Sequence, residues 1–263
     1  MPIIDVKDVS FGYDEDRMVL NGLSFSIDRP SFVCIVGPNG VGKSTLIRCM
    51  NGLIEPTSGE VDILGRNVRD YPLKELAKIV GYVPVMSGDF NILTVLDTVL
   101  IGRYAHQKWK TTQEDLDISY KALEAMEIES LAMRNFNELS AGQHQKVSLA
   151  RGLVQETQIL ILDEPTSNLD VRHQLYVSAF LKKLVRRTGI TVVMVSHDIN
   201  LSAKFADTVV VMEPPGRIYG IGTPEQVITK EMLRRVYKVD CDIIDDHGTP
   251  HVVLESVLFD DYA

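Results

Sequence analysis

A cluster of glycines, one lysine and two hydroxyl side chains near the beginning of this 263-residue chain could bind phosphate. Glycine lets the backbone turn its N–H groups toward phosphate oxygens, and a helix amino end adds partial positive charge. Lys43 has the spacing that reaches the β- and γ-phosphates of a nucleotide, and the hydroxyl of Ser44 is placed to ligate Mg²⁺. An ordinary strand-to-helix turn is the alternative, which this spacing disfavours. The nine residues are Gly37, Pro38, Asn39, Gly40, Val41, Gly42, Lys43, Ser44 and Thr45.

The residues on either side of this loop predict the strand and the helix that hold it. Phe32 to Val36 form an apolar, β-branched run that is typical of a buried strand. After the loop, Leu46 and Met50 recur at helical spacing, and Gly52 supplies a stop signal. A phosphate-binding loop requires this order of strand, loop and helix. We therefore expect the loop to bind a nucleoside triphosphate.

Two adjacent carboxylates end another apolar run farther along the chain. Residues 159–162 predict a strand buried on both faces, and Asp163 and Glu164 follow it at once. A buried charge is costly unless it is neutralised, and Mg²⁺ beside the phosphate loop would neutralise Asp163. Glu164 would then orient the attacking water and accept its proton. Solvated carboxylates at a strand exit are the alternative, but the phosphate loop favours the catalytic interpretation.

Ser140 and Gln143 have the spacing of a capping box, which predicts that a helix begins between them. The amino end of such a helix carries free N–H groups that can bind a second phosphate. A plain capped helix satisfies the same pattern, and the residues alone do not choose between the two interpretations.

The remaining patterns predict strands near both ends of the chain and helices in the middle. Apolar and polar residues alternate over 3–9 and 23–27, and the aromatic Tyr13 lies between these stretches. Thr111 and Glu114 fit a capping box for one of the helices. A helical block between α/β segments indicates an inserted subdomain. The helical patterns cover residues 94–103, 112–126 and 140–155.

We therefore predict an α/β fold with a P-loop (RecA-like) nucleoside triphosphatase core. This core carries an N-terminal antiparallel β subdomain and an inserted α-helical subdomain. A buried strand over 190–195 leads to His197, and polar groups thus gather where open α/β sheets bind ligands. The predicted domain bounds are 1–86 and 157–230 for the core, 87–156 for the helical subdomain, and 231–263 for a tail that forms a β-hairpin.

Composition argues for a protein without a membrane span of its own. No apolar run approaches the ~20 residues needed to cross a bilayer, and the amino end has no signal-peptide pattern. The net charge of -9 argues against nucleic acid as a partner. The cysteines, far apart in sequence, are expected to be thiols in a reducing compartment. They are Cys34, Cys49 and Cys241.

The order of these motifs resembles the ATP-binding subunits of ABC transporters over almost the whole chain. The phosphate loop is similar to their Walker A motif, and residues 159–164 are similar to Walker B. Leu139-Ser140-Ala141-Gly142-Gln143 resembles their LSGGQ signature, with Ala141 in place of one glycine. Residues 167–170 resemble the D-loop, His197 the switch histidine, and Tyr13 the aromatic that stacks on adenine.

The resemblance implies that two copies pair head to tail, with each ATP between one phosphate loop and the other copy's signature. Ser140, Gly142 and Gln143 would then contact the γ-phosphate in trans, and His197 would contact it in cis. Asp170 would line the dimer seam. ATP closes the dimer, hydrolysis reopens it, and this motion drives membrane partners through the helical subdomain.

One position departs from the family pattern. The family usually has a glutamine after Tyr-Val-Pro that contacts Mg²⁺ and water, whereas this chain has Val85 there. Valine can neither ligate a metal nor hydrogen-bond through its side chain. We therefore expect weakened metal coordination and slower hydrolysis, with ATP binding largely kept.

Residues 93–99, with the Ile101-Gly102-Arg103 that follows, look most like the corresponding residues in importers of iron–siderophore, haem or cobalamin compounds. Residues 87–103 would hold the docking surface for the permease, and an extracytoplasmic substrate-binding protein would act indirectly. The resemblance thus implies a peripheral protein on the cytoplasmic face of the membrane. Zinc or manganese importers, exporters, soluble ABC ATPases and a binding module without turnover remain as alternatives. A solvated hairpin explains Asp245, Asp246, His247 and His251 better than a metal site does.

Overall fold

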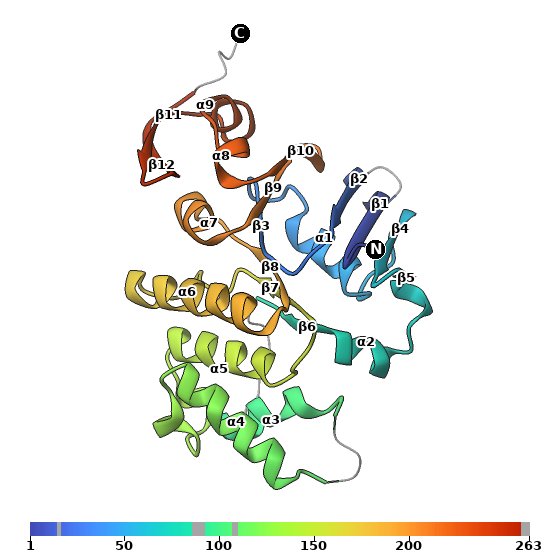
Figure 1. The fold of residues 1–263 in the computed structure, drawn as a ribbon, viewed down its shortest axis with the longest axis vertical. Helices are drawn as coiled ribbons and strands as arrows, with labels where there is room; N and C mark the ends of the chain where they lie inside the picture. The colour runs from blue at the N-terminus through green and yellow to red at the C-terminus, as the bar shows by residue number, and fades with distance from the viewer. Residues whose placement is uncertain (15–16, 86–92, 107–109, 259–263) are drawn as a thin grey trace. The chain divides into compact units, whose positions relative to one another are not determined.

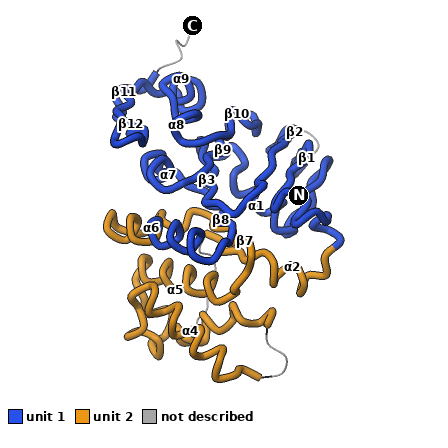
Figure 2. The backbone as a smooth tube through the Cα atoms, viewed as in Figure 1, with its two compact units in different colours: residues 1–70, 178–263 blue, residues 71–177 orange. Residues whose placement is uncertain are grey.

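The computed structural model describes residues 1–14, 17–85, 93–106 and 110–258, and this chain divides into two compact units (Figure 2). The first unit contains residues 1–70 and 178–263, and the second contains residues 71–177. One helix, α6 (Val171–Thr188), begins in the second unit and ends in the first. Every helix within the described ranges is too short or too polar to cross a bilayer.

An antiparallel sheet forms the amino-terminal part of the first unit. Its strands lie in the order β2-β1-β4-β5. β1 buries Ile4 and Val6 and leaves Asp5 and Lys7 partly exposed, as expected for a strand with one covered face. The elements are β1 (Ile4–Gly12), β2 (Met18–Ile27), β4 (Ser58–Ile63), β5 (Arg66–Asn67) and the short helix η1 (Val68–Asp70).

A second sheet in the first unit positions the phosphate loop. β3 runs parallel to β8 on one side and to β9 on the other, while β10 is antiparallel to β9. Every residue of β3 and β8 is buried, which explains their continuous apolar, β-branched sequences. Because parallel strands end at the same side of a sheet, the loops after β3 and β8 are neighbours. The strands are β3 (Phe32–Val36), β8 (Thr191–Val195), β9 (Thr208–Glu213) and β10 (Arg217–Gly222).

Short helices and a terminal hairpin complete the first unit. β11 and β12 pair antiparallel, and β12 packs against α7 (Figure 1). These elements are α1 (Lys43–Met50), α7 (Ile199–Phe205), α8 (Pro224–Val227), α9 (Lys230–Met232), the π-helical turn η5 (Leu233–Tyr237), β11 (Val239–Asp246) and β12 (Thr249–Val257).

The second unit packs helices α3, α4 and α5 together and pairs β6 parallel with β7. Leu123, Met126 and Val147 are fully or almost fully buried among these helices. The elements are α2 (Leu73–Ile79), β6 (Val80–Val83), α3 (Val95–Leu100), η2 (Ile101–Arg103), α4 (Gln113–Ala125), η3 (Glu129–Leu131), η4 (Phe136–Glu138), α5 (Ala141–Leu153) and β7 (Ile159–Asp163).

One predicted helix start was wrong by a residue. α4 is capped by Thr112 with Asp115, and not by Thr111 with Glu114. Both pairs have the spacing of a capping box, but Asp115 also binds the buried Arg103, which favours the observed register. The division of the chain after residues 70 and 177 differs from the bounds expected for the subdomains, which stay a prediction.

Candidate functional site

The phosphate loop follows β3 directly, and close packing explains its glycines. A Cβ atom added to Gly37 would lie 2.5 Å from the carbonyl oxygen of Met212, so no larger residue fits there. Gly42 precedes α1 with a φ of 102°, in the left-handed region that glycine adopts without strain. Within the described chain, no side chain caps the amino end of α1, so the helix presents its first N–H groups.

Lys43 lies over this loop and bonds to its carbonyl groups. Its Nζ donates to the carbonyl oxygens of Gly37 and Pro38 at 2.8 and 2.9 Å, and the residue is only 5% exposed. Ser44 is half-buried and Thr45 is buried. The loop thus curls around a buried ammonium group, with an uncapped helix end beside it. This arrangement fits the terminal phosphates of a nucleotide.

His197 lies near this loop, at the end of the neighbouring strand. Ile35 and Val195 are paired in register, and the Ser196 amide donates to the Ile35 carbonyl oxygen at 3.1 Å. His197 follows as an exposed residue, and Asp198 caps α7 by accepting from the Leu201 amide at 2.8 Å. The fold therefore brings the predicted switch histidine and the phosphate loop to the same end of one sheet.

Tyr13 also belongs to the first unit, just after β1. Its ring meets that of Phe11 edge to face, with centroids 5.0 Å apart and an interplanar angle of 87°. The residue is 59% exposed. A ring that is more than half exposed and meets one neighbour at right angles can stack on another aromatic group.

The two predicted Walker B carboxylates lie in the second unit. Asp163 ends β7 and is only 1% exposed. Glu164 follows with a φ of 49°, a left-handed conformation that is strained for residues with a side chain. The amide and the hydroxyl of Ser167 both donate to the Glu164 carbonyl oxygen, at 3.3 and 3.1 Å. These two hydrogen bonds hold the strained backbone of Glu164 in place.

The predicted signature residues form the capping box expected at the start of α5. The Ser140 amide donates to Gln143 Oε1 at 2.9 Å, and the Gln143 amide donates to Ser140 Oγ at 3.3 Å. The first-turn amides of Ala141 and Gly142 have no acceptor within the helix at such a position. Ala141 is exposed and Gly142 half-buried. The capping box accounts for the start of the helix and does not use the amides of Ala141 and Gly142, which can donate to a ligand.

A groove of about 510 Å³ in the second unit is lined by residues of both the predicted signature and the predicted D-loop. Asp170 caps α6, because its Oδ1 accepts from the His173 amide at 2.9 Å and lies 2.8 Å from His173 Nδ1. The hydrogen bond from the His173 amide, assisted by the ring, holds the pKa of Asp170 below its ordinary value. The groove is lined by Glu127, Ile128, Ser130, Leu131, Ser140, Gly142, Gln143, Lys146, Asn168, Leu169, Asp170 and His173.

Val85 and the predicted permease-docking segment also lie in the second unit. Val85 follows β6 and is 40% exposed. Residues 86–92, which include the start of the docking segment, lie outside the described residues. The rest of the segment forms α3 and η2, and α3 begins with a capping box of Thr94 and Asp97.

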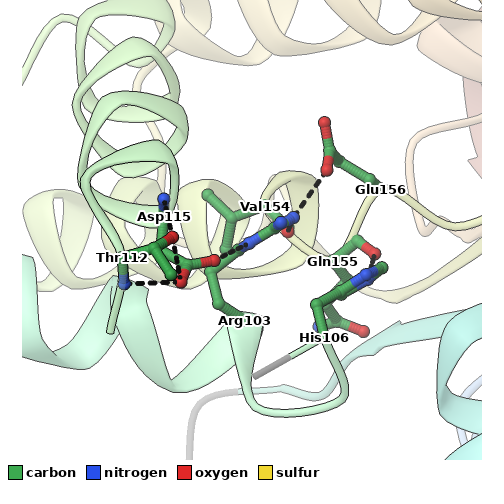
Figure 3. A network of polar contacts seen from close by, with 7 residues as sticks. All are labelled: Arg103, His106, Thr112, Asp115, Val154, Gln155 and Glu156. Carbon is green, nitrogen blue, oxygen red and sulfur yellow. Dashed lines mark hydrogen bonds and ion pairs between the residues drawn. The ribbon is translucent and has the colours of Figure 1, made fainter. Parts of the chain in front are cut away.

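Arg103, at the end of that segment, forms a buried network that sequence reasoning missed (Figure 3). Its Nε lies 2.9 Å from Asp115 Oδ1, and its Nη1 donates to the Val154 carbonyl oxygen at 2.8 Å and to Glu156 at 2.6 Å. Burial lowers the pKa of Arg103, but the two carboxylates outweigh it and leave the pKa raised. No local pattern reveals this network, since its members are up to 53 residues apart.

The predicted site residues therefore fall into two groups. Tyr13, the phosphate loop and His197 belong to the first unit, whereas the carboxylates, the signature, Asp170 and Val85 belong to the second. The predicted Mg²⁺ ligands Ser44 and Asp163 are divided in the same way. Within the described residues, no three side chains of histidine, cysteine, aspartate or glutamate cluster as metal ligands, and this includes the tail hairpin.

Comparisons with known proteins give one consistent result. A family model described as ABC transporter matches residues 20–167. An uncharacterised ABC transporter ATP-binding protein of Methanocaldococcus jannaschii is 41% identical, covering 95% of this chain and 97% of that protein. The ferric enterobactin transport ATP-binding protein of Escherichia coli is 36% identical, covering 94% of this chain and 92% of that protein. A solved structure described as a metal-chelate type ABC transporter is 26% identical with a TM-score of 0.81, covering 98% of both chains. The predicted α/β fold with a P-loop core is confirmed.

Proposed function

Because this chain belongs to the ABC transporter family, we propose that it is the ATP-hydrolysing subunit of an importer of metal chelates. The observation that carries the ATPase assignment is the loop after β3, which curls around the Lys43 ammonium beside an uncapped helix end. The ferric enterobactin relative and the metal-chelate transporter support the substrate class, which includes iron–siderophore, haem and cobalamin compounds.

The residues of the first unit would bind the nucleotide. The amides of the loop and of the first turn of α1 would hold the phosphate oxygens, and Lys43 would exchange its loop carbonyl partners for the β- and γ-phosphates. Tyr13 would stack on the adenine ring. His197 would polarise the γ-phosphate without acting as the base. When bound, ATP supplies the phosphoanhydride bond that is cleaved.

The carboxylate of Asp163, buried at the end of β7, offers oxygen ligands of the kind that a hard cation such as Mg²⁺ prefers. Asp163 and Ser44 would hold Mg²⁺, which offsets negative charge on the phosphates when bound. Glu164, held in its strained turn, would orient the attacking water and accept its proton. Val85 would contribute no ligand, and hydrolysis is therefore slower than a glutamine at this position would allow.

A second copy of the chain would complete the site. The amides of Ala141 and Gly142, together with Ser140 and Gln143, would contact the γ-phosphate bound to the partner copy. The groove of about 510 Å³ that is lined by the signature and Asp170 would receive the phosphate group, and Asp170 would line the dimer seam. Closure of two copies on ATP and their separation after hydrolysis would supply the motion for transport.

The membrane partners would be permease subunits docked on residues 87–103, and a substrate-binding protein would act indirectly from the other side. The protein would thus be peripheral, on the cytoplasmic face of the membrane. The net charge of -9 gives no support for a nucleic-acid partner.

The direct test is steady-state ATPase activity of the purified chain and of the Glu164→Gln variant, with Glu124→Gln as an exposed control. We expect Mg²⁺-dependent hydrolysis in the wild type and the control, and a loss of at least ~100-fold in Glu164→Gln with ATP binding kept. Equal turnover in Glu164→Gln and the wild type would contradict the assignment of the base. Co-purification with a polytopic membrane protein tests the transport role separately from hydrolysis.

A further inference from the structure

The tail hairpin, which consists of β11 and β12, is hydrogen-bonded to α7 through the side-chain amide of Asn200. Asn200 Nδ2 donates to the Val252 carbonyl oxygen at 3.1 Å, and the Val252 amide donates to Asn200 Oδ1 at 2.7 Å. The side-chain amide of Asn200 therefore bonds to both the N–H and the C=O group of one residue of β12. A residue of a neighbouring β-strand would make the same pair of hydrogen bonds. Val252 is buried, and β12 packs along α7 (Figure 1).

The helix held in this way begins just after His197. α7 contains only seven residues, and so short a helix is not stable without tertiary contacts. Leu201 and Ala203 of α7 are buried, and the helix packs against β3. α8 also packs against α7, and the tail hairpin adds a further support through Asn200. The direction of α7 thus depends on the sheet, on α8 and on the tail.

The two residues that flank His197 in sequence, Ser196 and Asp198, both have hydrogen-bonded backbones. On one side, the Ser196 amide donates to the Ile35 carbonyl oxygen of β3 at 3.1 Å. On the other side, Asp198 donates its amide to Ser196 Oγ at 3.2 Å and accepts from Ser202 Oγ of α7 at 2.8 Å. Any shift of α7 would therefore move the backbone on which the imidazole is carried.

We propose that the tail hairpin positions His197 for catalysis, with Asn200 as the positioning residue that transmits its hold. The proposal rests on the function inferred above, in which His197 contacts the γ-phosphate. It gives residues 239–257 a role in the ATPase cycle beyond closing the fold. In this proposal the hairpin acts on the phosphates through α7 and the histidine.

The test uses Asn200→Ala in the full chain, with Lys204→Ala as the matched control on the exposed side of the same helix. A displacement of about 1 Å in a catalytic group can cost up to ~100-fold in rate. We expect Asn200→Ala to lower kcat by about tenfold, with the Kd for ATP unchanged. The control should keep both values. Wild-type kcat in Asn200→Ala would overturn the proposal.

A double variant separates positioning from a general effect on the fold. If Asn200 acts through His197, then His197→Ala and Asn200→Ala should be non-additive, and the double variant should be as slow as His197→Ala alone. A further tenfold loss in the double variant would show that the effect does not pass through the histidine and would overturn the proposal.

A second readout does not depend on turnover. The imidazole signals of His197 in a ¹H–¹⁵N spectrum, assigned with His197→Ala, should shift in Asn200→Ala and not in Lys204→Ala. If the wild type hydrolyses no ATP, the proposed function fails, but this spectrum still tests the positioning. Unshifted His197 signals in Asn200→Ala would overturn the inference whatever the ATPase result.

Discussion

At the scale of single residues, we expect nucleotide binding to depend most on the side chain of Lys43. Its ammonium group is buried in the phosphate loop and bonded to two carbonyl oxygens there. We expect Lys43→Ala to lower hydrolysis by ~100-fold or more, since a preorganised charge on the phosphates is removed. Affinity for ATP should fall as well, and titration calorimetry measures it. Unchanged affinity and turnover would show that the loop does not bind phosphate.

Val85 carries the second prediction at this scale. The residue is 40% exposed after β6, so the larger glutamine side chain can be accommodated without overpacking a core. We expect Val85→Gln to raise turnover several-fold and to lower the Mg²⁺ concentration needed for half-maximal rate. Titrating Mg²⁺ against ATPase rate checks both effects. If neither quantity changes, the side chain at this position takes no part in catalysis here.

Sequence reasoning works well at this scale where the chemistry is local. The conformation of the loop after β3 could be predicted because its nine residues are contiguous, and Gly37 and Gly42 have the tight or left-handed positions that their types suggest. Its binding of phosphate stays a prediction. Arg103 could not be found, because its partners belong to other elements. The positive φ of Glu164 could not be predicted either, because no residue type or pattern around it indicates a left-handed backbone.

At the scale of elements, capping explains both a success and an error of the sequence analysis. Ser140 and Gln143 form the expected box at the start of α5. For α4 two overlapping boxes were available, and the structure uses Thr112 with Asp115. Tertiary contacts chose between them, since Asp115 meets Arg103, and helical periodicity carries no information about such a contact.

Arg103 joins η2 to the start of α4 and to the end of α5, and this predicts its effect on stability (Figure 3). Arg103→Ala removes the guanidinium from the buried Asp115 carboxylate, which keeps its hydrogen bonds from Thr112, and this costs about 3–5 kcal/mol in the free energy of unfolding. Arg103→Lys should recover only part of this loss, because a lysine cannot replace the forked guanidinium. Urea unfolding measures both variants. A loss below ~1 kcal/mol in Arg103→Ala would contradict a structural role for the network.

Asp115 gives the network a pH dependence. The hydrogen bond from the Thr112 amide, followed by Arg103, holds the pKa of Asp115 below its ordinary value of 3.8. A carboxyl whose pKa is depressed by folding stabilises the fold above its unfolded pKa and loses this contribution as the pH falls through the folded pKa. We expect the difference in unfolding free energy between the wild type and Asp115→Asn to shrink from about pH 6 to about pH 2. A constant difference would contradict this account.

At the scale of the whole molecule, the groups that sequence analysis assigned to one nucleotide site are carried by two compact units. The phosphate loop and His197 belong to one, and the carboxylates and the signature belong to the other. Local periodicity predicted most of the helices and strands, but the limits of the units depend on which strands pair. β6 and β7 pair within the second unit, so its bounds include more than the helical block.

In the proposed dimer, each ATP lies between the phosphate loop of one copy and the signature of the other. Mixing two inactive variants tests this arrangement most directly. Lys43→Ala disables the loop, and Gly142→Arg blocks the signature, where a Cβ makes only ordinary contacts, 3.5 Å from the Asn168 carbonyl oxygen. Neither variant alone should hydrolyse ATP. If sites form in trans, half of the dimers in an equal mixture are mixed and each has one intact site of two, so about a quarter of wild-type activity returns. A mixture as inactive as its components would contradict the account.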